Sequence, residues 1–256
     1  MQFGYISGSS LLVFHVPDHR DLTSERASRH LVLLVDGTWV SASNKLASER
    51  QSNLYRLNQY FDTHNRNGEA QITFYVPGLG SPSKGNRYFG GAFAFGIERD
   101  IEQVYVNISS NFKFSDAGVQ DKIYLFGFSR GALVVRVVAA LISRYGVLTG
   151  RNVEQYRYLW DDYIGARKID NLDLFVSNYC INNAVVQFLG CFDTVLGAHV
   201  SRHSKALRRA FFRNFELPKS VRNAVHILAM HERRAFFRPV LWEKAALETQ
   251  YLVDRV

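Results

Sequence analysis

An α/β fold, with a mostly parallel sheet covered by helices on both faces, is predicted for this 256-residue chain from two observations. Several short apolar runs are unbroken, which is typical of strands that are buried on both faces of a parallel sheet. One of these runs ends in a serine bracketed by glycines, and an apolar helical stretch follows it at once. The length fits one domain, so we expect residues 1–30 to form an N-terminal extension and residues 31–256 to form the domain.

Ser129 lies between the apolar run 123–126, which predicts a buried strand, and the run 132–142, which predicts a buried helix. Gly127 and Gly131 bracket it. A serine on such a sharp strand-to-helix turn has strained backbone angles, and small neighbours let the chain segments pass closely. The pattern predicts a nucleophile elbow with Ser129 as nucleophile, and a purely structural turn is the alternative.

Backbone donors for an oxyanion are predicted on both sides of this serine. The first turn of the following helix directs N–H groups and the positive end of its dipole toward the serine, and Arg130 supplies the nearest N–H. The apolar run 31–35 predicts another buried strand, which ends at Asp36, Gly37 and Thr38. These residues form either a plain Asp-Gly turn or the second half of an oxyanion hole, with Gly37 or Thr38 as donor and Asp36 in support.

An acidic residue follows the next predicted strand. The run 184–192 predicts that strand, and Asp193 comes directly after it. An α/β-hydrolase carries at this place the acid that orients its histidine, so Asp193 is the predicted acid of a triad, with a structural turn aspartate as the alternative. The predicted fold is therefore α/β-hydrolase-like.

The remaining elements are predicted from periodicity and turn residues. They are a strand near 11–15, a helix over 52–61, a strand over 72–76, a helix over 97–112, a largely helical insert reaching 178, a helix over 221–235 and a strand over 250–253. The glycine-rich and aromatic region 81–96 predicts a flexible wall or lid over the active site.

The composition argues against several classes of function. Two cysteines are too few for a disulfide scaffold, no Cys/His cluster has zinc-ligand spacing, and no glycine motif has the context of a nucleotide loop. We therefore expect no metal and no cofactor. The start lacks a signal-peptide pattern, and no apolar run reaches about 18 residues, so we expect synthesis in the cytoplasm without a membrane-spanning helix.

The net charge of +8 is concentrated in residues 201–239, which hold ten Lys and Arg against two Glu. A solvated helical face explains this, and so does contact with an anionic membrane or an acidic partner protein. No nucleic-acid motif is present, and we expect no nucleic-acid partner.

Six segments resemble, in order and rough spacing, the α/β-hydrolase domain of type VI secretion phospholipase effectors. They are 34–39 (LVDGTW), 52–57 (SNLYRL), 75–80 (YVPGLG), 124–132 (YLFGFSRGA), 189–195 (LGCFDTV) and 226–234 (HILAMHERR). The resemblance covers about residues 31–253 and implies esterase or phospholipase chemistry, with Ser129 as nucleophile and Asp193 as acid. It also implies a lipid or membrane surface as substrate and export by a dedicated secretion system.

The histidine of the triad is where the resemblance stops. In the family it lies in a Gly-Val-His-x-Asp-Val-Gly-Gly-Gly-Tyr segment after a strand that begins much like 250–253. This chain ends where that segment would start, so we expect the domain to be C-terminally incomplete relative to the family. Four histidines follow the predicted acid: His199, His203, His226 and His231. None lies in a loop after a late strand, and His226 is a weak candidate for the base.

Two classes of function follow from these observations. The first is a serine hydrolase of lipid esters, whose triad is completed by a histidine of this chain or by another polypeptide. The second is a shortened or degenerate hydrolase fold that acts as a binding module, or a gene fragment. In either case the strand at 250–253 leaves an open sheet edge, where we expect self-association or a partner chain.

Overall fold

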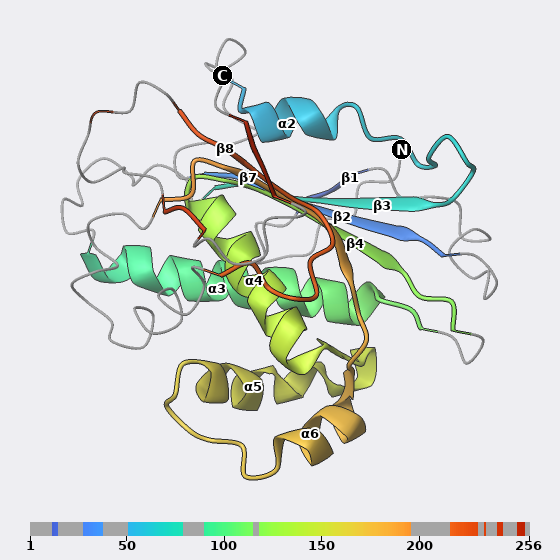
Figure 1. The fold of residues 1–256 in the computed structure, drawn as a ribbon, viewed down its shortest axis with the longest axis vertical. Coiled ribbons are helices and arrows are strands. Elements are labelled where there is room, and N and C mark those ends of the chain that lie inside the picture. The colour runs from blue at the N-terminus through green and yellow to red at the C-terminus, as the bar shows by residue number, and fades with distance from the viewer. Residues whose placement is uncertain are drawn as a thin grey trace.

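The computed structural model of the chain describes residues 12–14, 28–37, 51–78, 90–114, 118–195, 216–229, 233, 240–242 and 250–253. Its centre is a seven-stranded sheet, in the order β1-β3-β2-β4-β7-β8-β9 among the described strands, with helices on both faces (Figure 1). All neighbouring strands run parallel except β1, which is antiparallel to β3. The predicted α/β-hydrolase-like fold class is confirmed.

Apart from β8, which replaces part of a predicted helix, the strands of this sheet form where strands were predicted, with ends that differ by a few residues. Their bounds are Leu12–Phe14 (β1), His30–Val35 (β2), Gln71–Val76 (β3), Lys122–Phe128 (β4), Val186–Phe192 (β7), Ala224–Ile227 (β8) and Gln250–Val253 (β9). β4 lies between β2 and β7 near the middle of the sheet, so the residues that follow these three strands meet at one edge.

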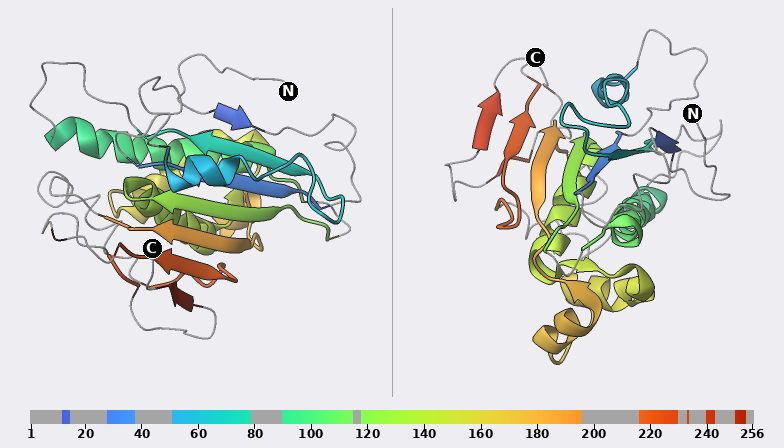
Figure 2. Two further views of the ribbon diagram at one scale, coloured as in Figure 1. Left: turned by 90° about the horizontal axis from the view of Figure 1, so that it is seen from above. Right: turned by 90° about the vertical axis from the view of Figure 1, so that its right-hand side faces the viewer.

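Two layers of helices enclose the sheet (Figure 2). α3 (Gly90–Asn111) and α4 (Arg130–Tyr145) cover one face, and α2 (Asn53–Asn58) lies on the other. Beyond α4 lie the 3-10 helix η1 (Gly150–Gln155), α5 (Tyr156–Tyr163), α6 (Leu172–Tyr179) and a short hairpin of β5 (Val147–Leu148) with β6 (Cys180–Ile181). None of the helices in the described ranges has the length and apolar character needed to cross a membrane.

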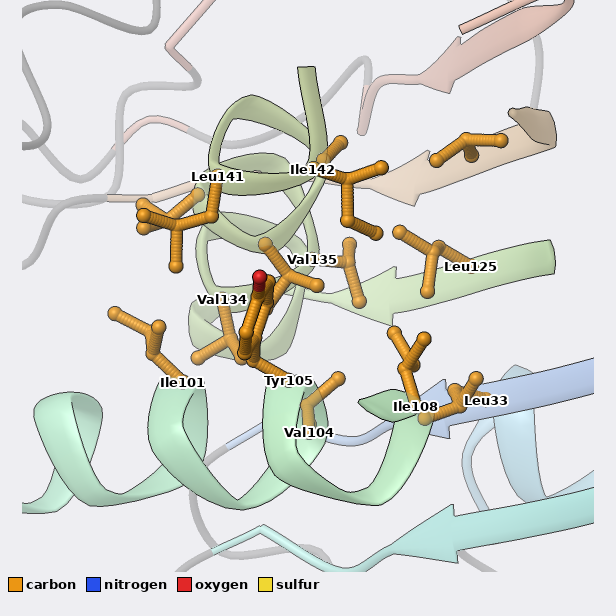
Figure 3. Close-up of a cluster of buried hydrophobic side chains, with 14 of the residues drawn as sticks. Leu33, Ile101, Val104, Tyr105, Ile108, Leu125, Val134, Val135, Leu141 and Ile142 are labelled. Atoms are coloured by element: carbon orange, nitrogen blue, oxygen red, sulfur yellow. The ribbon is translucent and has the colours of Figure 1, made fainter. Parts of the chain in front are cut away.

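The main core lies between the sheet and the pair α3 and α4 (Figure 3). α4 is buried almost all round, since only Ala140, Ser143 and Arg144 escape burial. A helix that is apolar on every side is expected where strands pack on one side and helices on the other. The helix ends at Gly146, whose φ of 81° is a conformation that glycine adopts without strain. This packing fixes the start of α4 against the end of β4.

The predicted N-terminal extension contributes to the sheet through β1, which is the outermost described strand on its side and pairs with β3. The boundary region is also tied to the domain, because Arg29 and Asp121 form a buried ion pair with side chains 5% and 2% exposed. Arg29 also donates its backbone N–H to the Asp121 carboxylate at 3.1 Å. The pair joins the starts of β2 and β4, at the sheet edge opposite the elbow.

The helix predicted over 221–235 is wrong at its start, because residues 224–227 form β8. β8 pairs in parallel with β7 on one side and β9 on the other. Ala224 and His226 are buried while Val225 and Ile227 are half-buried, an alternation that belongs to a strand. Pairing on both sides of the strand outweighs the weak helical periodicity of this stretch.

Two helix boundaries also differ from the prediction. α3 begins at Gly90, so residues 90–96 are helical and do not belong to the predicted wall or lid, whose remaining residues 81–89 lie outside the described ranges. Glycine costs about 1 kcal/mol in a helix interior, and tertiary packing overrides this cost here, as the burial of Gly96 indicates. α2 ends at Asn58, earlier than predicted.

Candidate active site

Ser129 occupies a strained turn between the last residue of β4 and the first residue of α4. Its backbone angles are φ 55° and ψ −115°, and a positive φ is uncommon for a residue other than glycine. The side chain is half-buried, and its hydroxyl caps no helical N–H and accepts no hydrogen bond from the described residues. The sharp strand-to-helix turn that the sequence predicts is therefore present, with an uncommitted hydroxyl at its tip.

The bracketing glycines are required by close backbone contacts. A Cβ on Gly127 would lie 2.4 Å from the carbonyl oxygen of Gly131, and a Cβ on Gly131 would lie 2.0 Å from that of Val35. Both separations are far below any real contact of a Cβ atom. The chain can thus pass from β4 into α4 beside the end of β2 only because these two residues lack side chains.

The loop after β2 lies directly against the elbow. A Cβ on Gly37 would come within 3.2 Å of the Ser129 Cβ. The Gly37 N–H donates to the Asp36 carboxylate at 2.9 Å, so this predicted oxyanion donor is already engaged. Thr38, the other predicted donor of this loop, lies outside the described residues. The described geometry therefore shows one predicted donor of this loop, Gly37, with its N–H bound to Asp36.

Asp36 holds three elements together at this edge. Its buried carboxylate accepts hydrogen bonds from the hydroxyls of Ser52 and Tyr75, the latter at 2.6 Å. Ser52 in turn caps α2 by accepting the Tyr55 N–H. Burial raises the pKa of Asp36, and the hydrogen bonds it accepts act in the opposite direction. Asp36 thus supports the loop by tying β2 to β3 and to the start of α2.

Arg130 contributes more than the backbone N–H that sequence reasoning assigned to it. Its N–H lies in the first turn of α4, where the helix dipole favours negative charge. Its guanidinium is buried and lies 3.5 Å from the carboxylate of Asp100 in α3. Burial lowers the pKa of Arg130, and the charge of Asp100 acts against this. No local sequence signal connects these two residues, because only the packing of α3 on α4 brings them together.

Asp193 lies at the same sheet edge as Ser129. The residues before them, Phe128 and Phe192, are register partners in β4 and β7, and the Ser129 N–H donates to the Phe192 carbonyl at 2.7 Å. Asp193 has a φ of 46° and is half-buried. Its carboxylate accepts the Ala229 N–H at 2.6 Å, which ties the end of β7 to the turn after β8. The structure thus brings the predicted nucleophile and the predicted acid to neighbouring turns.

His226 does not have the geometry of a catalytic base. It is 1% exposed in the middle of β8, and its Nε2 accepts the Thr194 N–H at 3.2 Å. Its ring lies against Trp242 with centroids 5.2 Å apart, and the guanidinium of Arg136 lies over the same indole ring. Burial, followed by the positive charge of Arg136, lowers the pKa of His226 to about 4. The side chain instead anchors the turn that follows Asp193.

This anchor predicts a specific loss of stability in acid. The unfolded chain binds a proton at His226 with a pKa near 6.5, whereas the native state resists protonation until about pH 4. The native state therefore loses stability as the pH falls through this window, by about 3 kcal/mol in total for this one residue. Urea unfolding at pH 7 and pH 4 should show a smaller loss in His226→Gln than in the parent. Equal losses in both proteins would contradict this role.

The other histidines of the described ranges lie at the edge of the sheet where the parallel strands begin, away from Ser129. His30 starts β2, and His64 pairs with Ala70 just before β3. His199, His203 and His231 lie outside the described residues, as does most of the basic segment 201–239.

The described residues were also compared with the requirements of a metal site and of a reactive thiol. There, no group of three His, Cys, Asp or Glu side chains is placed to hold a metal ion. Cys180 and Cys191 are free thiols, and burial raises the pKa of each to about 12, so neither is a thiolate at neutral pH.

Comparison with known proteins relates the chain to several others. It is 25% identical over 240 residues to the uncharacterized protein YEL023C of Saccharomyces cerevisiae. This match covers 83% of this chain and 32% of that protein. An uncharacterized protein of Pseudomonas aeruginosa superposes with a TM-score of 0.49 and 17% identity, over 82% of this chain and 36% of that one. The Tle1 effector bound to the VgrG spike of the type 6 secretion system gives a TM-score of 0.44 and 20% identity, over 89% and 50%. The chain thus spans a third to a half of the length of these relatives.

One family matches most of the chain. Residues 29–252 fit the family described as the catalytic domain of the Tle1-like phospholipase effectors of the type VI secretion system (T6SS). The match includes the elbow, the turn after β7, the strands β2 to β8 and all but the last residue of β9. The chain therefore belongs to the family of Tle1-like phospholipase effector catalytic domains.

Proposed function

We propose that the chain is a serine hydrolase that cleaves carboxylic ester bonds of phospholipids, with Ser129 as nucleophile and Asp193 as the acid of the triad. The observation that carries the proposal is the strained turn at Ser129, whose hydroxyl is uncommitted and lies at the start of a buried helix. Strain of this kind persists only where the surroundings enforce it, and it gathers at functional sites. Membership of a phospholipase effector family supports the same reading.

The proposed reaction has two steps, acylation of Ser129 and hydrolysis of the acyl-serine. The Ser129 Oγ bonds to the ester carbonyl carbon while its proton passes to a histidine, and the N–H of Arg130 stabilises the resulting oxyanion together with that of Thr38. The carbon–oxygen bond to the alcohol then breaks, and the alcohol leaves with the histidine's proton. Water attacks the acyl-serine, gives its proton to the histidine and releases the fatty acid, after which Ser129 regains its proton.

Two measurements on the purified chain test the proposal. A fluorophosphonate probe should label the folded protein at Ser129, as located by mass spectrometry of its peptides. Vesicles of a defined phospholipid should release free fatty acid in the presence of the protein. A folded protein that neither takes the label nor releases fatty acid would favour the alternative of a hydrolase fold that serves as a binding module.

Three alanine variants can identify the base. His199, His203 and His231 all follow Asp193 in the chain, and His64→Ala serves as the matched control at the opposite sheet edge. Loss of the base should lower the rate of fatty-acid release by about 10⁴-fold or more, because the serine is a weak nucleophile without it. If the purified chain is active and all three variants keep its rate, the base is another residue of this chain.

An anionic membrane is the surface that the basic segment 201–239 fits. Near an acidic leaflet each Lys or Arg contributes about 1 kcal/mol of attraction, and salt screens this attraction. We expect the protein to sediment with liposomes in proportion to their anionic lipid content and to be released at about 0.5 M salt. Binding that depends on neither lipid charge nor salt would rule out the electrostatic account.

The predicted partner or self-association at β9, the outermost described strand on its side, stays a prediction.

A further inference from the structure

We propose that the buried ion pair between Asp100 and Arg130 positions the nucleophile elbow, so that α3 is part of the catalytic apparatus. This inference rests on the proposed function of Ser129 and assigns a positioning role to a residue 29 positions away in the sequence. It goes beyond the triad and the oxyanion donors, because neither Asp100 nor the guanidinium of Arg130 takes part in bond making.

The pair is built into the interior beside the reacting group. The Arg130 Nη2 lies 3.5 Å from the Asp100 Oδ2, and the two side chains are 2% and 6% exposed. Arg130 is directly bonded to Ser129 and is the first residue of α4. Its backbone N–H is the proposed oxyanion donor, so whatever fixes the Arg130 side chain also fixes the direction of that donor.

Each side of the strained turn has its own anchor. On the β2 side, Gly131 lies against the Val35 carbonyl with no room for a Cβ. On the β7 side, the Ser129 N–H donates to the Phe192 carbonyl. The α3 side is held through Asp100. A positive φ at a serine persists only when its surroundings over-determine it, and the ion pair supplies the third direction of constraint.

Charge makes this pair more than a packing contact. Two apolar side chains of similar volume would fill the same space at no greater cost, because burying two charges offsets much of their attraction. This cost appears in the pKa of Asp100. Burial raises that pKa to about 6, although the positive charges of Arg130 and Arg99 lower it. The carboxylate is mostly ionised at pH 7, and its charge attracts the guanidinium toward α3, which an apolar pair would not do.

The chain provides a matched control in the pair Arg29–Asp121. It is buried to the same degree, with side chains 5% and 2% exposed. It lies at the other edge of the sheet, where the Lys122 N–H donates to the Arg29 carbonyl at the start of β4. Asp121→Asn therefore removes a comparable buried charge without touching the elbow.

The test compares Asp100→Asn with Asp121→Asn in the full chain. Two quantities are measured well below the melting temperature: the rate of fluorophosphonate labelling at rising probe concentration, and hydrogen exchange of the peptide that carries the Ser129 amide. In Asp100→Asn we expect the maximal labelling rate to fall about 10- to 100-fold with an unchanged half-saturating concentration, and the elbow amides to lose protection. Asp121→Asn should melt earlier yet keep both quantities at their parental values.

The outcomes separate this inference from the proposed function. If the parent takes no label, the proposed function fails, and the exchange of the elbow amides still decides whether the ion pair positions the turn. Equal exchange and labelling in Asp100→Asn and the parent would overturn the inference. If Asp100→Asn does not fold, the double variant Asp100→Leu, Arg130→Met removes both charges together. A folded double variant with parental labelling and exchange would also overturn it, whereas a folded one with a loose elbow supports it.

Discussion

Ser129→Ala should lower the rate of phospholipid hydrolysis by about 10⁶-fold and abolish fluorophosphonate labelling, since removal of the nucleophile costs about as much as removal of a whole triad. That factor corresponds to about 8 kcal/mol of lost transition-state stabilisation. The fold should be unaffected, because the Ser129 hydroxyl makes no hydrogen bond to the described residues and alanine meets the same backbone strain. Fatty-acid release from phospholipid vesicles gives the rate, and thermal melting checks the fold.

Ser143→Ala is the matched control for this substitution. Ser143 is an exposed serine near the C-terminal end of α4, the helix that Ser129 precedes, and Ser143→Ala should keep the parental rate and the parental label. Hydrolysis that survives in Ser129→Ala at a rate close to the parent's would place the activity at another residue.

Gly131→Ala should destabilise the protein by about 3 kcal/mol, because a Cβ at this position meets rigid backbone and overpacking is among the mechanisms behind the large single-residue effects. The new atom would lie 2.0 Å from the Val35 carbonyl oxygen and 2.8 Å from that of Asp36. Neither atom belongs to a flexible side chain, so α4 would have to move away from β2. The turn that carries Ser129 would move with it. We therefore expect loss of labelling together with loss of stability in urea unfolding.

Gly150→Ala separates this effect from the general cost of replacing a glycine. The nearest atom to a Cβ at Gly150 is the Ser109 carbonyl oxygen at 3.5 Å, an ordinary van der Waals contact, and its φ is not in the left-handed region. Its stability should change by less than about 1 kcal/mol. A Gly131→Ala protein with parental stability and full labelling would contradict the prediction that a Cβ at this position displaces the elbow.

Some features of the fold could be predicted because a local pattern causes them. An unbroken apolar run has no polar face to expose, so β2 and β4 could only be interior strands. The elbow was predictable for the same reason, since two glycines around a serine allow a close passage that other residues block. Parallel strands place their carboxyl ends at one edge, and this alone put Asp193 beside the turn of Ser129.

Other features depend on partners that are far away in the sequence. His226 belongs to a strand because β7 and β9 pair with it on both sides, and that pairing removed a candidate base and made it an anchor for the turn after Asp193. The start of α3 at Gly90 was also missed, since glycine by itself disfavours a helix.

The sequence by itself determined the strands with unbroken apolar runs, the tight turn at Ser129 and the edge of the sheet at which Asp193 lies, because each follows from hydrophobicity, glycine sterics or strand direction within a few residues. Only the tertiary structure decided which polar groups meet. The Asp36 carboxylate accepts a hydrogen bond from Tyr75, and Arg130 pairs with Asp100, because separate elements pack together. Such pairs are selected by the cost of burying an unpaired polar group, and that cost exists only once the chain has folded around them.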